Sequence, residues 1–479
     1  MASGLRRARS SAPPQLRKVA VLAAVLLALA VGFASAIVPT PIAALALGGS
    51  LVVLLALTRW PLIPLLSLAV VMSIPRFSLD LQGITINSER VLLPCLLLAA
   101  VAAQLYRRDA RPRAGWAHVG LIVYLIALAS SSILVAPDRA QSERLTVLVA
   151  VASSPFWLVP ILTSRPHWVR VGFGAFLVAA FTEALLGVTS VVINVTTGVE
   201  LGLQRDSLTG VLTPFGTQFE GNIFGSFVAA GFVGWLAWLV GRPGGLQRRW
   251  LEIGVLLVLG LGVAVSFSRG AWIAAAAGTL IVVVAGSRGR RFAALTAAGV
   301  SIGVVAAVVL VVANTPFGTG FVTRLVSLPA VATGSVVDTR FDQQYTQGLI
   351  FVDWSTSPII GTGTGSLGES YRYLTVNVPA WNGNLELHVL HDSGLLGVFG
   401  LTTLITATAL PLIRLLRRPE RGGDTPIVLS ALAIMVVLLV AFQATEATYL
   451  AWSWYLLGLA WSAGHPRSQE SPRAVDRIY

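Results

Sequence analysis

Two arginines stand in strongly apolar or membrane-adjacent surroundings, and their chemistry suits phosphate. Arg269 lies in a Ser-Arg-Gly junction that joins two apolar stretches with almost no loop. Arg340 lies in a Thr-Arg-Phe-Asp context within a long polar segment. An arginine at membrane depth is costly, so it usually faces a cavity or a partner. A guanidinium group can bind two phosphate oxygens at once. The pair therefore indicates a site for a phosphate-bearing ligand.

Each arginine also has a structural interpretation that the sequence leaves open. Arg269 can reach water along the membrane surface, or pair with Glu220 or Asp206. Arg340 can be a solvated side chain that forms an ion pair with a nearby aspartate. A third arginine, Arg205, precedes another apolar stretch.

A second set of polar residues opens the apolar stretch that follows the long polar segment. Asn384, His388 and His391 are spaced i, i+4 and i+7, which places them on one helix face. Asn384 suits a helix N-cap, and a neutral histidine can act as a general base toward a hydroxyl. The alternative is a pair of interfacial histidines bonded to loop carbonyls. Two histidines with Asp392 also resemble a metal-ligand set, but the spacing does not establish its geometry, and no metal is predicted.

The polar segment contains two further patterns. Over residues 338–353, apolar and polar residues recur at helical spacing. This pattern predicts an amphipathic helix on the membrane surface, with Arg340 on its polar side. Gly361, Gly363 and Gly365 permit positive φ angles and could present N–H groups to phosphate. A plain turn is the favoured interpretation of these glycines.

The elements that must position these residues are membrane spans. The chain has 479 residues, of which 55% are hydrophobic and 11% charged, and its mean hydropathy is +0.78. Apolar runs long enough to cross a core of ~30 Å recur throughout. The predicted fold is an all-α, polytopic transmembrane helical bundle of about 12–14 spans, with one large helical periplasmic loop. Glu183 and Glu446 lie inside predicted spans, as structural hydrogen-bond partners or as parts of a pathway.

The predicted spans are bounded as follows: Val19–Ile37, Pro41–Thr58, Pro61–Ile74, Val91–Tyr106, Ala117–Val135, Leu145–Leu162, Val169–Ile193, Asn222–Val240, Leu251–Val265, Ala271–Ala285, Phe292–Val312, Leu385–Ile413, Ile427–Ala444 and Tyr449–Ala463. The predicted organisation is a cytoplasmic tail (1–18), eleven spans (19–313), a large extracytoplasmic loop (314–386), three more spans (387–463) and a second cytoplasmic tail (464–479).

Positive charge sets the predicted orientation. The net charge is +13, yet 25 of the 34 Lys and Arg residues fall in loops on one side of the predicted spans. Such an excess marks the cytoplasmic face, so both ends are predicted to be cytoplasmic. The charge is thus a topology signal, and nucleic acid is not an expected partner. The lone cysteine, Cys95, cannot form an intramolecular disulfide and is expected to be a small core residue.

Taken together, these residues give the chain a resemblance to the O-antigen ligase and polymerase superfamily of bacterial membrane glycosyltransferases. The resemblance covers about residues 200–415. It is carried by four elements: Ser268-Arg269-Gly270-Ala271; Arg340 followed by Trp354, Pro358 and Gly361-x-Gly363; Asn384-Leu385 with Gly394-Leu395-Leu396-Gly397; and, more weakly, Arg205 with Gly210 and Asn222. Two positions depart from the pattern. Gly383 stands where ligases usually have His, and Glu220-Gly221-Asn222 stands where Asn-Pro-Asn is usual.

The resemblance implies a metal-independent transferase without a cofactor, working at the outer face of the cytoplasmic membrane. Its donor would be a polyprenyl-diphosphate-linked glycan, and its acceptor a hydroxyl of a glycan, a lipid or another molecule. Arg269 and Arg340 would hold the diphosphate, and a polar group near Asn384, His388 or Glu220 would orient the acceptor hydroxyl. His388 or His391 would take the place of the usual ligase histidine, unless the reaction needs none. The implied substrate-binding residues are Arg205, Asn222, Glu220, Asn384 and Gly363.

Two functions from other classes remain open. One is a transporter of a small anion, which the absence of an evident inverted repeat disfavours. The other is a non-catalytic protein of envelope assembly.

Overall fold

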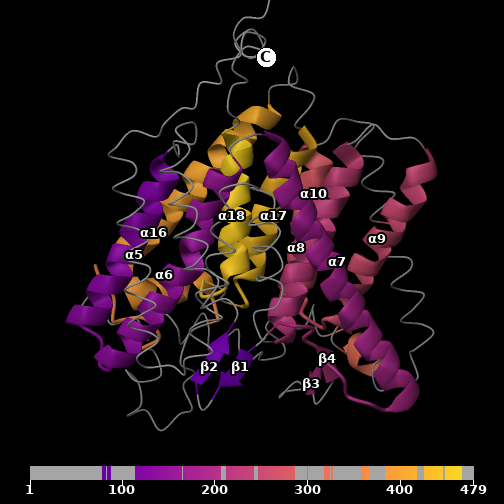
Figure 1. Ribbon diagram of the computed structural model, residues 1–479, viewed down its shortest axis with the longest axis horizontal. Helices are drawn as coiled ribbons and strands as arrows, with labels where there is room; N and C mark the ends of the chain where they lie inside the picture. Colours follow the sequence, from indigo (N-terminus) through magenta and orange to yellow (C-terminus); the bar gives the residue numbers. More distant parts are fainter. Residues whose placement is uncertain are drawn as a thin grey trace, which may run out of the picture.

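The computed structural model describes a helical bundle for most of the chain between residues 114 and 465 (Figure 1). The described residues are 78–81, 84–87, 114–163, 166–205, 212–218, 220–241, 246–285, 299, 318–323, 325–326, 358–366, 383–417, 425–445 and 448–465. Side chains are not described at 78–87, at 166 and at 241–249.

The helices of this part of the chain follow the predicted spans closely. They are α5 (Trp116–Leu134), α6 (Arg139–Leu162), α7 (Pro166–Thr197), α8 (Gly221–Gly241), α9 (Leu246–Val265), α10 (Arg269–Ala285), α16 (Leu385–Leu416), α17 (Thr425–Ala441) and α18 (Ala451–Gly464). Five of them, α5, α6, α7, α8 and α16, are long and apolar enough to cross a membrane. A multi-pass helical membrane protein is thereby confirmed. Shorter apolar helices lie beside them, α10 and α17 among them.

Some predicted features lie outside the described residues. They are the spans Val19–Ile37, Pro41–Thr58, Pro61–Ile74, Val91–Tyr106 and Phe292–Val312, the amphipathic helix at 338–353, both tails and most of the large loop. The total number of spans and the extent of that loop therefore stay predictions.

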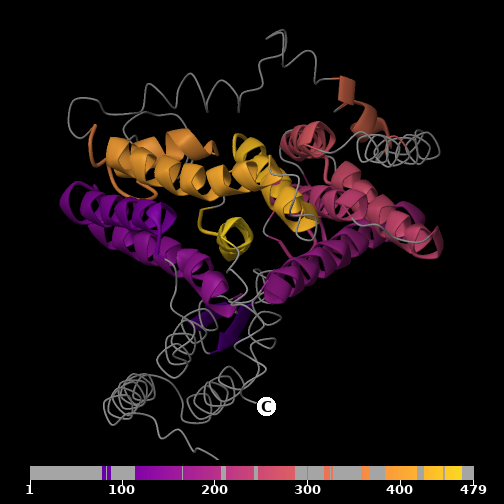
Figure 2. The same cartoon turned by 90° about the horizontal axis from the view of Figure 1, so that it is seen from above.

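Helices α17 and α18 lie between two groups of helices. Helix α16 packs on α5 and α18 packs on α6, while α8 and α10 pack on α17, and α7 and α9 pack beside α8. Figure 2 shows α5, α6 and α16 on one side, α7 to α10 on the other, and α17 and α18 between them. The hydrophobic core continues from the central helices into the second group. The buried rings of Trp452 on α18 and Phe227 on α8 meet edge to face, with centroids 5.3 Å apart.

Helices α5 and α16 approach each other closely because each has a glycine that faces the backbone of the other. A Cβ placed on Gly120 would lie 2.5 Å from the amide nitrogen of Leu404. A Cβ placed on Gly400 would lie 2.6 Å from the amide nitrogen of Tyr124. Small residues that let backbones meet are a usual means of packing helices in membranes, where water does not drive the association.

The ends of the described helices sort into two opposite groups. At one end, the Gly115 backbone lies against the Trp461 ring, and the Thr163 hydroxyl donates to Ser462 Oγ at 2.8 Å. At the other end, Gly363 meets Ala136. The first group adjoins the arginine-rich loops predicted to be cytoplasmic, and the second contains segments predicted to face outward. Chain direction thus alternates as a series of spans requires.

Two short hairpins add strands that the sequence analysis did not predict, in a structure that is otherwise almost entirely helical. Strands β1 (Ser78–Leu81) and β2 (Ile84–Asn87) pair antiparallel, with Ser78 opposite Asn87. Strands β3 (Leu203–Arg205) and β4 (Leu212–Pro214) also pair antiparallel, with Leu203 opposite Pro214. Both hairpins fall in segments predicted as outward loops. The signal for the first was present, since an alternating apolar pattern is interrupted by two residues ending in Gly83.

Candidate functional site

Helix α16 is broken at Gly394, and a short segment of the large loop fills the break. Gly394 has φ 64° and ψ −165°, a conformation outside any helix. The amide groups of Leu395 and Leu396 donate to the carbonyls of Pro358 and Ile359, each at 2.9 Å. In the other direction, the Thr362 amide donates to the His391 carbonyl at 2.9 Å. The segment Pro358–Ser366, called the inserted turn below, thus replaces hydrogen bonds that a continuous helix would make.

Glycine is required on both sides of this junction. A Cβ on Gly394 would overlap the Ile359 carbonyl oxygen, and one on Gly361, where φ is 80°, would lie 2.5 Å from the Ser393 nitrogen. The N–H of Gly363 donates to the Asp392 carbonyl at 3.1 Å. The favoured interpretation of the glycines as a turn therefore agrees with the geometry, since the N–H groups of residues 362, 363 and 365 all donate to α16.

The two histidines and Asp392 form one buried cluster at the break. Asp392 Oδ2 lies 3.1 Å from His388 Nε2, and Asp392 Oδ1 lies 2.9 Å from His391 Nδ1. The Gly365 amide also donates to Asp392 Oδ2, at 2.8 Å. A carboxylate accepts only, so each of these imidazole nitrogens carries a proton toward it. All three side chains are at most 5% exposed, so the face shared by Asn384, His388 and His391 points into the protein.

The Thr362 hydroxyl does not complete a charge-relay arrangement with His391. It lies 3.3 Å from Nδ1 and 3.1 Å from Nε2, and is therefore nearly equidistant from the two ring nitrogens. An oxygen at such a position cannot lie in line with either nitrogen. Its better partner is the His391 carbonyl oxygen, 3.0 Å away.

Four hydroxyl groups connect the inserted turn, and through it the break in α16, to α5 and α6. Ser132 Oγ lies 2.7 Å from Thr146 Oγ1 and 3.1 Å from Thr364 Oγ1, and the Ser142 hydroxyl donates to Ser132 at 2.8 Å. Thr146 and Thr364 are 2.6 Å apart. These contacts tie the inserted turn to α5 and α6, so that three distant parts of the sequence meet at the broken helix.

The first turn of α16 is joined to the end of α17 by polar side chains. Asn384 is the predicted N-cap, and its Oδ1 accepts from the Leu387 amide at 3.0 Å. Its amide group donates to Gln443 Oε1 at 3.0 Å. Gln443 in turn donates to both carboxylate oxygens of Glu386, at 2.7 and 2.8 Å. The Leu385 amide donates to the Phe442 carbonyl, which closes the connection.

Arg269 lies at the same end of the bundle. It is the first residue of α10, is half-buried, and follows Ser268, whose hydroxyl caps the helix by accepting from the Ala271 amide at 3.2 Å. A Cβ on the next residue, Gly270, would lie 3.1 Å from the Ala444 Cβ. Arg269 therefore begins its helix beside the end of α17, where Gln443 binds Asn384 and Glu386.

The start of α8 lies beside the start of α10. A Cβ on Gly225 would lie 2.7 Å from Ser266 Oγ and 2.9 Å from the Ala271 Cβ. Glu220 and Asn222, both half-buried, lie within five residues before this contact. The structure thus brings the starts of α8, α10 and α16 together at one end.

Arg205 occupies a different setting. It ends β3 and is exposed, and its guanidinium lies 2.5 Å from Glu200. Arg340, Glu446 and Asp206 lie outside the described residues, so the predicted convergence of Arg269 and Arg340 stays a prediction.

Glu183 is a structural hydrogen-bond partner, which agrees with one of its two interpretations. It is buried in α7 and accepts from the Thr217 amide at 3.1 Å and from the Thr217 hydroxyl. The contact secures the segment that leads from β4 into α8. Metal-ligand groups of three or more His, Cys, Asp or Glu residues are not found in the described part of the chain.

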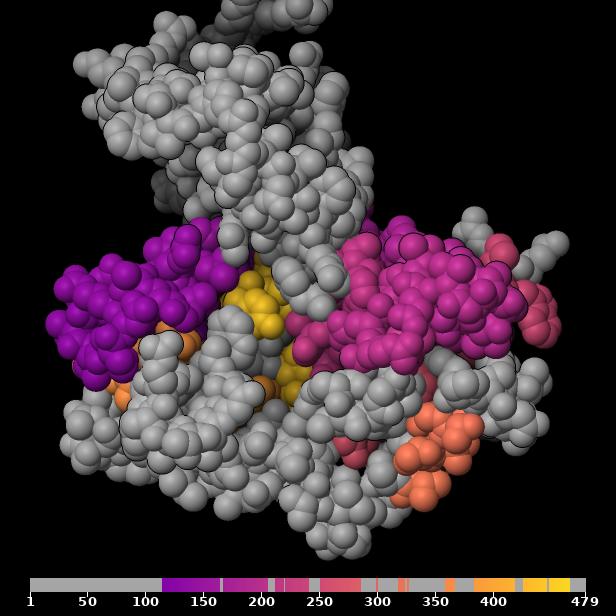
Figure 3. Space-filling view, turned by 90° about the horizontal axis from the view of Figure 1, so that it is seen from below, coloured from indigo at the N-terminus to yellow at the C-terminus, as the bar shows by residue number. Residues whose placement is uncertain are grey.

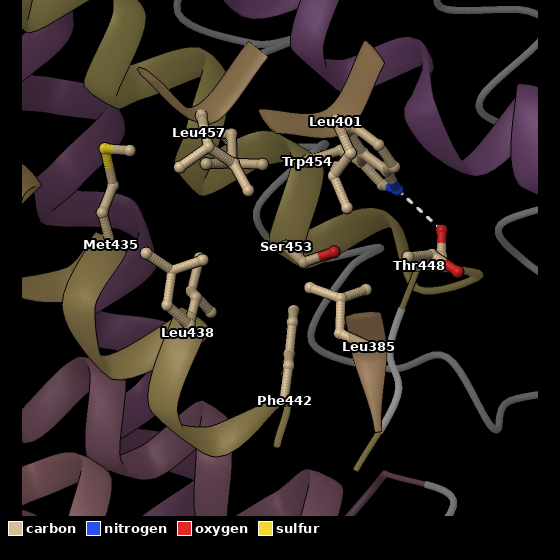
Figure 4. A pocket seen from close by; sticks show the side chains of 11 residues that line it. Leu385, Leu401, Met435, Leu438, Phe442, Thr448, Ser453, Trp454 and Leu457 are labelled. Carbon is tan, nitrogen blue, oxygen red and sulfur yellow. Dashed lines mark hydrogen bonds between the residues drawn. The ribbon is translucent and has the colours of Figure 1, made fainter. Parts of the chain in front are cut away.

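An apolar pocket of about 30 Å³ lies between α16, α17 and α18 (Figure 4). Its lining is almost entirely apolar, from Leu385 at the start of α16 to Met435 and Trp454. The Trp454 indole N–H donates to the Thr448 carbonyl at 2.7 Å. Seen from below, yellow atoms of the C-terminal described segment show between the purple and magenta halves of the bundle (Figure 3).

Two of the residues that join the start of α16 to the end of α17 were not identified from the sequence. Gln443 was not singled out, and residue 386 served only as the end of the predicted loop 314–386. The first turn of a helix favours an acidic residue, which was the available signal for Glu386. Nothing local to the sequence pairs it with Gln443, 57 positions away.

Compared with known proteins, the chain matches no protein-family model and none of the curated proteins.

Proposed function

We propose that the protein is a membrane glycosyltransferase of the O-antigen ligase and polymerase type. It transfers a polyprenyl-diphosphate-linked glycan to an acceptor hydroxyl at the outer face of the cytoplasmic membrane. The observation that carries the proposal is the meeting of three helix starts, with Glu220 and Asn222, Arg269, and Asn384, at one end of an apolar bundle. The resemblance in residues 200–415 assigns its chemistry.

In the proposed reaction the acceptor hydroxyl attacks the anomeric carbon of the donor sugar. The bond from that carbon to the diphosphate breaks, and polyprenyl diphosphate leaves. Arg269, with Arg340 as its proposed partner, stabilises the charge that develops on the diphosphate. A half-buried guanidinium at a helix start suits this role, because its field is less screened than at the open surface.

The test uses the full chain in lipid nanodiscs with a polyprenyl-diphosphate-linked oligosaccharide, which also supplies the acceptor hydroxyl for polymerisation. Membrane extract of the source cells supplies other acceptors. Release of polyprenyl diphosphate measures turnover. We expect Arg269→Ala and Arg340→Ala each to lower the rate by about 10²-fold or more. Arg139→Ala is the matched control, because Arg139 forms an exposed ion pair with Glu143 at the same end. Full activity in both arginine variants would overturn the proposal.

One observation favours a transporter as the second candidate. Helix α16 is discontinuous and carries a buried Asp–His cluster at its break, and broken helices with buried ionisable groups are typical of transporter binding sites. Flux of a small anion into proteoliposomes, without release of polyprenyl diphosphate, would establish that function instead.

A further inference from the structure

The Glu386 carboxylate is exposed yet held in one position. It projects from the first turn of α16, where both of its oxygens accept hydrogen bonds from Gln443 Nε2 at 2.7 and 2.8 Å. Gln443 is itself oriented by Asn384 and by its own bond to the Leu439 carbonyl at 3.1 Å. The carboxylate is therefore preorganised by a neutral donor, which does not cancel its negative charge.

Other acidic side chains described at this end of the bundle differ from Glu386 in their burial or in their bonding partners. Glu143 and Glu200 are each paired with an arginine at 2.5 Å, which offsets their charge. Glu183 and Asp392 are buried and use their oxygens in bonds within the protein. Glu220 is half-buried, and Asp138 caps α6 by accepting from the Gln141 amide at 3.0 Å. Glu386 combines exposure, a fixed orientation and a neutral hydrogen-bond partner, the properties that a carboxylate needs to take a proton from a substrate. Unlike Asp138, it takes part in the contacts that join the start of α16 to the end of α17.

The position of Glu386 relates it to Arg269. Gln443, which holds Glu386, is followed by Ala444, and Ala444 lies against Gly270, the residue after Arg269. The Glu386 carboxylate and the backbone beside Arg269 thus both lie next to residues 443 and 444, at the end of α17. His388 and His391 lie on the buried side of α16, where both bind Asp392.

We propose that Glu386 is the general base of the transfer reaction. This rests on the proposed function. As the acceptor oxygen bonds to the anomeric carbon, its proton passes to a Glu386 carboxylate oxygen, and the electron pair of the breaking bond leaves with the diphosphate. The products are the new glycoside, polyprenyl diphosphate and a protonated Glu386, which returns its proton to water. His388 and His391 then have no proton-transfer role and act through Asp392 to hold the inserted turn.

The test compares Glu386→Gln with the wild-type protein in the nanodisc assay described above. The substituted glutamine keeps the size of the side chain and an oxygen that accepts from Gln443, so the fold is retained. We expect the turnover rate to fall by about 10²-fold or more, because general base catalysis contributes factors of this size, with the KM for donor little changed. Glu143→Gln is the matched control at an ion-paired carboxylate, and it retains activity within about threefold.

Rescue separates a base from a structural acid. In Glu386→Ala, added formate supplies a small carboxylate, and we expect it to restore part of the lost rate in a concentration-dependent way. Glu386→Gln activity within about threefold of wild type, or loss without any rescue by formate, would overturn the assignment while leaving transfer itself established. Absence of transfer by the wild-type protein, with anion flux in its place, would overturn the proposed function and the base together.

Discussion

At the scale of single residues, Asp392 joins both histidines of α16 to the inserted turn. One carboxylate oxygen binds His391, and the other binds His388 and the Gly365 amide. A buried carboxylate is tolerated only where its oxygens are satisfied in this way. The sequence placed the three side chains close together and left the histidines either as groups that serve a substrate or as structural groups. In the structure both histidines bind Asp392.

We expect Asp392→Asn to destabilise the protein by on the order of 3 kcal/mol, because removing one partner from a buried ionic cluster leaves the others unsatisfied. The asparagine NH₂ group would face an imidazole N–H, which donates as well. The midpoint of thermal unfolding in detergent measures the change. Thr408→Val is the control on the same helix, since its hydroxyl bonds to the Leu404 carbonyl of its own helix and its loss costs below about 1 kcal/mol. Equal midpoints for the two variants would contradict the role given to Asp392.

At the scale of elements, the break in α16 and the inserted turn form one unit. Four backbone hydrogen bonds join them, and Thr364 continues the contact to Ser132 on α5. The broken helix keeps its backbone groups bonded because another part of the chain supplies the partners, as non-helical backbone within a membrane protein requires.

We expect Gly394→Ala to detach the inserted turn. Its backbone strain alone costs about 1–3 kcal/mol, and the methyl group would overlap the Ile359 carbonyl. In a chain whose Cys95 is replaced by alanine, Ser132→Cys with Thr364→Cys should form a disulfide under mild oxidation, since the native hydroxyls are 3.1 Å apart.

Adding Gly394→Ala should reduce the yield of that disulfide severalfold. Gly254→Ala on α9 is the matched control, because a Cβ there meets nothing within 4 Å and the residue has no positive φ angle. An unchanged disulfide yield with Gly394→Ala would show that the turn does not depend on the break.

At the scale of the whole molecule, the described helices form two groups joined by α17 and α18. Two polar junctions, one between Asn384 and Gln443 and one between Ser132 and Thr364, lie toward the same end of the bundle. The excess of arginine in loops at the opposite end predicts that the junctions face outward.

Membrane-impermeant maleimide tests this orientation in intact cells. In the Cys95→Ala background, we expect Arg139→Cys to react from outside, whereas Arg414→Cys should react only after the membrane is permeabilised. Both positions are exposed in the structure and lie near opposite ends of the bundle. The reverse pattern of labelling would place the polar junctions in the cytoplasm and exclude an outer-face transferase.

Local pattern was sufficient for the helices, because a run of apolar residues long enough to cross a membrane must satisfy its backbone internally and so becomes helical. The same reasoning located the cap at Asn384 and the short junction at Arg269. It missed the strands β1 to β4, whose few residues carry a weak signal inside polar loops.

Tertiary structure alone decided which polar groups meet. The pairing of Gln443 with Glu386, and of Thr364 with Ser132 across 232 positions, depends on how the helices pack, and the spacing of residues along the chain does not encode it. The break at Gly394 has the same origin, because a glycine within an apolar run is compatible with an unbroken helix until another segment supplies the hydrogen bonds that replace its own. The sequence by itself determined a helical membrane protein with Arg269, His388 and His391 near helix starts. Their partners, and so their chemistry, follow from packing.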